Sequence, residues 1–138
     1  MKKSKWLWYT VIVGMIPLII RSLLYIFSTK TISFFNAPDL IFFGIILSIT
    51  NINELEYVNI KRDNPKGKTW KTRTNVLSIV LVIIYSSFLI FTGVNEMTQN
   101  LFNISAITYS ALLLNFVNFL FSLSIYRMIN SIESHQKT

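Results

Sequence analysis

Long runs of apolar residues dominate this chain, and short polar stretches separate them. Four such blocks occur, at about 6–27, 38–60, 74–92 and 104–126. A helix needs roughly 20 mainly apolar residues to cross about 30 Å of hydrocarbon at 1.5 Å per residue. The blocks therefore predict an all-α integral membrane protein with four transmembrane helices. Short connections favour antiparallel neighbours, so we expect one domain folded as an up-down four-helix bundle.

Two of the four blocks contain an ionisable residue at the edge of their apolar stretch. Arg21 interrupts the first block, which is too long for a signal peptide and lacks a small-residue cleavage site. We expect its side chain to reach the headgroups, with a buried ion pair as the alternative. Glu54 lies at the mixed, polar end of the second block, where it is either a solvated residue paired with Lys61 or Arg62, or a functional carboxylate.

The distribution of basic residues predicts which way the chain is oriented. Eleven of the 13 lysines and arginines fall in the amino end, the middle stretch 61–73 and the carboxyl tail, and only Arg21 and Lys30 fall on the other side. Positive residues favour the cytoplasmic side of a membrane. We therefore expect a protein of the bacterial inner membrane with both termini in the cytoplasm. The same rule explains the net charge of +7, so direct nucleic-acid binding is not expected.

The fourth block has a polar stripe in its middle. Asn115 and Asn118 are three residues apart and share one helix face with Ser122. An amide in hydrocarbon must find a hydrogen-bond partner, and another helix is the nearest source. We interpret the stripe as a helix–helix contact within the chain, or as a polar seam between copies in a homo-oligomer. The remaining alternative is a wall of a polar pathway.

The stretch 61–73 is expected to be a basic cytoplasmic loop that docks a partner protein or rests on anionic lipid. Its candidate residues are Lys61, Arg62, Lys66, Lys68, Trp70, Lys71 and Arg73.

Catalytic chemistry is not expected. Cysteine is absent, the one histidine (His135) lies in the polar tail, and no spacing fits a metal, a phosphate loop or a nucleophile with its base. We therefore expect neither cofactor nor metal.

These features favour a non-catalytic inner-membrane subunit, an anchor, sensor or effector that acts with a cytoplasmic protein partner. In size, span count and charge placement the chain resembles the small four-span membrane subunits of bacterial phage-defence systems, such as Kiwa. It is also similar to four-span immunity proteins against pore-forming bacteriocins. The first resemblance implies an oligomer that serves antiviral defence, and neither carries over any residue. A small oligomeric channel or transporter is the alternative from another class.

Overall fold

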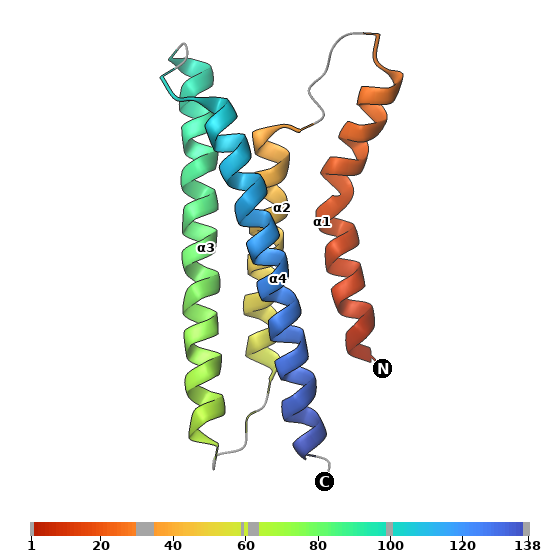
Figure 1. Cartoon of the computed structure of the whole chain (residues 1–138), viewed down its shortest axis with the longest axis vertical. Coiled ribbons are helices and arrows are strands. Elements are labelled where there is room, and N and C mark those ends of the chain that lie inside the picture. Colours follow the sequence, from red (N-terminus) through yellow and green to blue (C-terminus); the bar gives the residue numbers. More distant parts are fainter. Residues whose placement is uncertain (1, 30–34, 59, 61–63, 99–100, 137–138) are drawn as a thin grey trace.

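Four α-helices make up the described part of the chain, and no strand occurs in it (Figure 1). The structure is a computed structural model that describes residues 2–29, 35–58, 60, 64–98 and 101–136, and only the backbone of residues 2–10, 133, 135 and 136. The helices are α1 (Lys2–Phe27), α2 (Ala37–Tyr57), α3 (Pro65–Met97) and α4 (Ile104–Gln136).

Among the residues that the structure describes, three segments are long and apolar enough to cross a membrane, namely Ala37–Tyr57, Pro65–Met97 and Ile104–Ile132. In α1 the apolar segment within the fully described residues is Val11–Phe27, because only the backbone of residues 2–10 is described. Large hydrophobic side chains cover the outside, whereas the buried residues of α3 are Tyr85, a glycine and four polar residues. This reverses the usual arrangement of a soluble helix and fits lipid as the surrounding solvent. The expectation of an all-helical membrane protein is confirmed to this extent.

The prediction of a loop over 61–73 was wrong for residues 65–73, which form the first turns of α3. Asn64 caps this helix, because its side-chain oxygen accepts a hydrogen bond of 2.9 Å from the Gly67 amide. Pro65 follows in the first turn, where its missing N–H is not needed. Asn64 followed by Pro65 is a typical helix start. It was missed because the helix was predicted from the apolar block, which begins only at about residue 74.

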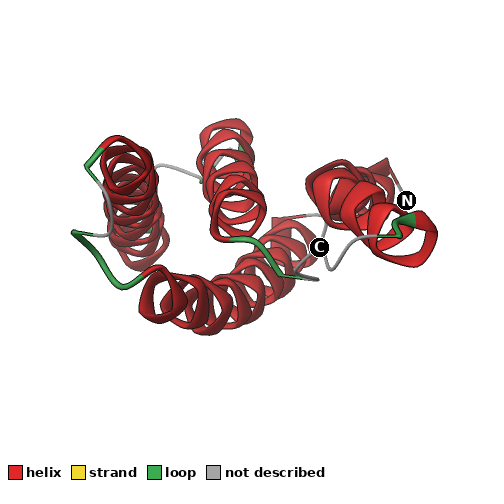
Figure 2. Cartoon of the chain, turned by 90° about the horizontal axis from the view of Figure 1, so that it is seen from above, coloured by secondary structure: helices red, strands yellow, loops and turns green. Residues whose placement is uncertain are grey.

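Helix α2 lies at the centre and packs against each of the other three helices. Viewed from above, α2, α3 and α4 form a group and α1 stands apart from α3 (Figure 2). Among the described helices α1 packs only on α2, where Gly14 lies against Phe43 and Ile46. The fold is therefore a three-helix core with α1 attached to one side, instead of a closed four-helix bundle.

The helix ends and the chain termini are divided between the two ends of the molecule. Both termini, the end of α2 and the start of α3 lie at the lower end in Figure 1, which we call the basic end. The end of α1, the start of α2, the end of α3 and the start of α4 lie at the far end.

An ion pair links α1 to α2 near the far end. The Nε of Arg21 donates to a carboxylate oxygen of Asp39, and both side chains are about one-fifth exposed. The ion pair that the sequence offered as the alternative is therefore present, although both partners are partly exposed. That Arg21 reaches the headgroups stays a prediction. Asp39 lies in the first turn of α2, and the antiparallel packing of α1 brings Arg21 to the same height.

Candidate functional site

A layer of buried polar side chains lies in the middle of the three-helix core. Tyr85 of α3 donates its hydroxyl proton to Asn115 Oδ1 at 2.7 Å, and Asn115 Nδ2 donates to the Leu40 carbonyl oxygen at 2.7 Å. Asn118 Nδ2 donates to the Gly44 carbonyl oxygen at 3.1 Å and to Ser48 Oγ at 2.9 Å. We call this set the polar layer; it comprises Ser48, Asn51, Ser78, Tyr85, Asn115, Asn118 and Ser122, all buried.

Gly44 makes this meeting of three helices possible. A Cβ atom at this position would clash with the Tyr85 ring and lie 2.5 Å from Asn115 Oδ1. The missing side chain lets the tyrosine ring approach the backbone of α2 and leaves the Gly44 carbonyl oxygen accessible to Asn118. Helical carbonyls already accept one bond within their helix, and the second lone pair of the Leu40 carbonyl oxygen accepts from Asn115. The Gly44 carbonyl oxygen accepts from Asn118 and also from the Ser48 hydroxyl at 2.9 Å.

Two apolar clusters enclose the polar layer along the axis of the core. The far-end cluster is built on Ala37, Leu40, Ile41, Ile107 and Ala111, and the Tyr85 ring belongs to it. The basic-end cluster is built on Leu55, Val58, Ile125 and Ile129, with Trp70 packed against it. The layer is therefore closed off at both ends by hydrocarbon side chains.

Three buried atoms of the described residues have no hydrogen-bond partner. They are Asn51 Nδ2, Asn75 Oδ1 and Asn118 Oδ1. Such atoms are rare, because leaving a buried donor or acceptor unpaired costs about 1–3 kcal/mol. Asn51 and Asn118 both belong to the polar layer, so it contains one donor and one acceptor that the protein itself does not satisfy.

The structure brings together the three residues that the sequence singled out on the fourth block. Asn115, Asn118 and Ser122 are buried, and both amides bond to α2 of the same chain, so they form a contact within the chain. Sequence reasoning missed Gly44, Ser48 and Tyr85. A glycine followed four residues later by a serine, inside an apolar run, was the available signal for a close helix approach.

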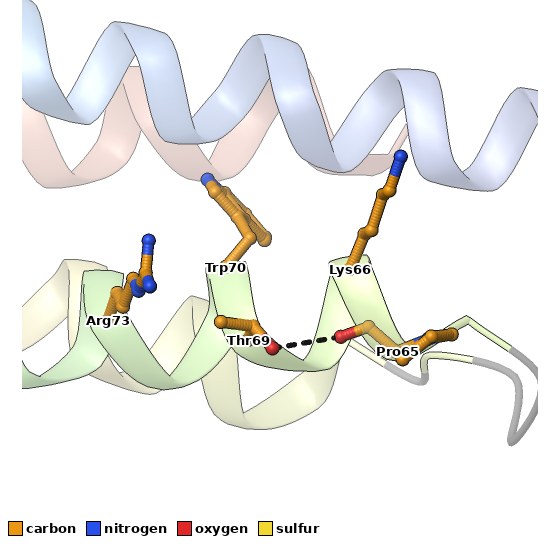
Figure 3. A pocket seen from close by; sticks show the side chains of 5 residues that line it. All are labelled: Pro65, Lys66, Thr69, Trp70 and Arg73. Carbon is orange, nitrogen blue, oxygen red and sulfur yellow. Dashed lines mark hydrogen bonds between the residues drawn. The ribbon is translucent and has the colours of Figure 1, made fainter.

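The basic end holds the second candidate site. Lys66, Lys68 and Arg73 are exposed on the first turns of α3, and Trp70 is half-buried. A groove of about 430 Å³ is lined by Pro65, Lys66, Thr69, Trp70 and Arg73. Figure 3 shows the Lys66 and Trp70 side chains on the same side of α3. The groove thus combines two cationic groups, a hydroxyl and an indole on one short helical segment.

Lys71 was predicted to dock a partner protein or lipid, but the structure shows that it makes a contact within the chain. Its Nζ donates to the carbonyl oxygens of Val58 at 3.0 Å and Glu56 at 3.3 Å. These carbonyls lie at the end of α2, where the helix dipole is negative and a cation is stabilising. Lys71 thus ties α3 to the end of α2. Lys61 and Arg62 lie outside the described residues, and Glu54 is half-buried on α2.

Replacing Lys71 by methionine is expected to lower the stability of the fold by about 1 kcal/mol, because charged contacts at a helix end contribute on this scale. The measurement is thermal unfolding in mild detergent, followed by circular dichroism. Lys68→Met is the matched control, since Lys68 is exposed three residues earlier on the same helix. Equal melting temperatures for the two variants would contradict the role assigned to Lys71.

Within the described residues no group of three His, Cys, Asp or Glu side chains could hold a metal ion. No family model, curated protein or solved structure matches the chain.

Proposed function

We propose that this protein is a non-catalytic membrane subunit that binds an acidic cytoplasmic protein at its basic end. The supporting observation is the helical order of residues 65–73, which present exposed Lys66, Lys68 and Arg73 beside Trp70. The proposal includes a cytoplasmic location for both termini. Its support is the placement of 11 of the 13 basic residues in the amino end, residues 61–73 and the carboxyl tail.

The length of the helices favours a protein partner over lipid alone. Residues 65–73 add about 13 Å of helix before the uncharged stretch of α3 begins, at 1.5 Å per residue. The headgroup zone on one side of a bilayer is only about 5–8 Å thick. Helix α4 also continues past Tyr126 to Gln136. The two helices therefore have the length to project beyond the headgroups and offer a rigid, charged surface.

Trp70 is suited to the centre of such an interface. Tryptophan and arginine are enriched among the residues that contribute most to protein–protein binding, whereas surrounding lysines mainly steer association. Trp70 is held in place by the basic-end cluster, so it loses little freedom on binding. Lys66, Lys68 and Arg73 around it would select a partner with an acidic surface.

A channel or transporter has less support. A pathway for ions or solutes along α4 requires that the side chains of Asn115 and Asn118 line an open space. Both amides are buried and bonded to α2, and apolar clusters lie on either side of them.

The test is co-purification from native membranes in mild detergent, with the triple variant Lys66→Gln, Lys68→Gln and Arg73→Gln. A companion protein should be recovered in fixed stoichiometry with the wild type. The triple variant should bind it about tenfold or more weakly, at roughly 0.5–1 kcal/mol for each exposed charge pair. Lys71 is left unchanged because of its structural contacts with α2.

The matched control removes three other charges, with Lys2→Gln, Lys3→Gln and Lys5→Gln, and should keep the companion. A wild-type protein that emerges alone would refute the proposal. Loss of bound anionic lipid from the triple variant, with companion binding unchanged, would also refute it and assign the basic end to lipid.

A further inference from the structure

We propose that the polar layer binds a small uncharged guest that bridges Asn51 of α2 and Asn118 of α4, with water or ammonia as the class of molecule. The inference starts from Asn51 Nδ2 and Asn118 Oδ1, which are buried and without a partner. Asn51 is 1% exposed and Asn118 is 0% exposed, so neither headgroups nor bulk water reach them.

The register of the helices brings the two residues to neighbouring heights along the core. Asn118 bonds to Ser48, and Asn51 follows Ser48 by one helical turn on the same buried face of α2. Tyr85 lies against Gly44, and α3 runs antiparallel to α2. Ser78 lies seven residues before Tyr85, and Asn51 lies seven residues after Gly44. Ser78 and Asn51 therefore occupy about the same depth in the core.

The hydrogen-bond requirements of the surrounding groups define the guest. Ser78 donates its hydroxyl proton to the Thr74 carbonyl oxygen, and Ser122 donates to that of Asn118, so both hydroxyl oxygens are left as acceptors. Asn118 Oδ1 is a third acceptor, and Asn51 Nδ2 is a donor. A guest must therefore donate more bonds than it accepts. Water and ammonia meet this demand, and an anion, which only accepts, does not.

The charge of the surroundings favours a neutral guest. No buried side chain among the described residues carries a charge, and a lone ion in such an environment is strongly disfavoured. Bound water in proteins typically makes about three hydrogen bonds to buried groups that lack partners. The two apolar clusters close the layer at both ends, so the guest would be sheltered from exchange with the surroundings.

The experiment is nuclear magnetic resonance on the full chain in lipid nanodiscs, with labelled asparagine side chains. The side-chain amide protons of Asn51 and Asn118 should show cross peaks at the water frequency. In the variant Asn51→Leu, the Asn118 cross peak should weaken at least severalfold, because the bridge has lost one support. The matched control is Asn53→Leu, which changes an exposed amide on the same helix and should leave that cross peak intact.

A second arm distinguishes ammonia from water. Ammonium chloride is added at a pH near 9, with potassium chloride as the control for salt. Saturable shifts of the Asn51 and Asn118 side-chain signals with ammonium chloride alone would identify ammonia as the preferred guest. Water cross peaks without such shifts would identify water.

The proposal is overturned if the wild type gives neither water cross peaks nor ammonia-dependent shifts. It is also overturned if the two amides show a direct short-range contact with each other and none with water. The wild-type spectra decide this even where Asn51→Leu does not fold.

Discussion

Replacing Gly44 by alanine is expected to destabilise the three-helix core by about 3 kcal/mol, the upper end of the usual effect of overpacking. The added Cβ would lie well within van der Waals contact distance of the Tyr85 ring and 2.5 Å from Asn115 Oδ1. The tyrosine would have to move away, and its bond to Asn115 would break with it. The ring fills the space between α2 and α4, so no flexible side chain is available to absorb the shift.

The measurement is the unfolding free energy in mixed micelles, with Gly93→Ala as the matched control. Gly93 also lies inside a helix, but a Cβ there meets nothing within 4 Å. The control should be neutral or more stable by up to about 1 kcal/mol, because alanine has the better helix propensity. If both variants unfold at the same point, close packing at Gly44 does not hold the core together.

Replacing Asn115 by leucine is expected to cost about 2–4 kcal/mol. Leucine is close to asparagine in size, so the effect comes from the polar groups that lose their partner. The Tyr85 hydroxyl would lose its bond to Asn115, and the second lone pair of the Leu40 carbonyl oxygen would be left without a donor in a low-dielectric core. Each unpaired buried group contributes about 1–3 kcal/mol. The far end of α4 should then separate from α2 more readily.

A double-mutant cycle with Tyr85→Phe isolates the bond between the two side chains. We expect a coupling energy of about 0.5–1.5 kcal/mol, the range of measured bonds between transmembrane helices. Asn130→Leu serves as the control, because it changes an exposed amide on the same helix. A coupling near zero would mean that Tyr85 and Asn115 find other partners, and the polar layer would then not be a specific contact.

The two sites depend on each other through the basic-end cluster. Trp70 packs on Leu55, Val58, Ile125 and Ile129, directly below the polar layer. Loosening α2 from α4 would therefore also loosen the support of Trp70. For this reason, the partner-binding test keeps the core intact and changes only exposed charges.

Part of the candidate site could be read from particular residues of the sequence. Asn115 and Asn118 stood out because amides are rare in an apolar run and must find hydrogen-bond partners. Their partners could not be read, since any of three helices could supply a carbonyl. Arg21 and Asp39 could not be paired from sequence either, because a reach to the headgroups satisfies an arginine near a helix end equally well. The role of Lys71 depends on where α2 ends, which the mixed polar stretch at 51–60 concealed.

The sequence alone determined that this is an all-helical chain with apolar helices long enough for a membrane, because only hydrocarbon as solvent favours such long uncharged blocks. It also determined where the basic residues gather along the chain. The tertiary structure decided that α2 is central, that α1 stands to one side, and that Gly44 admits Tyr85 into the core. The physical reason is that leucines facing lipid and leucines facing a helix are chemically alike. Only the close fit of small and polar side chains between helices selects one arrangement.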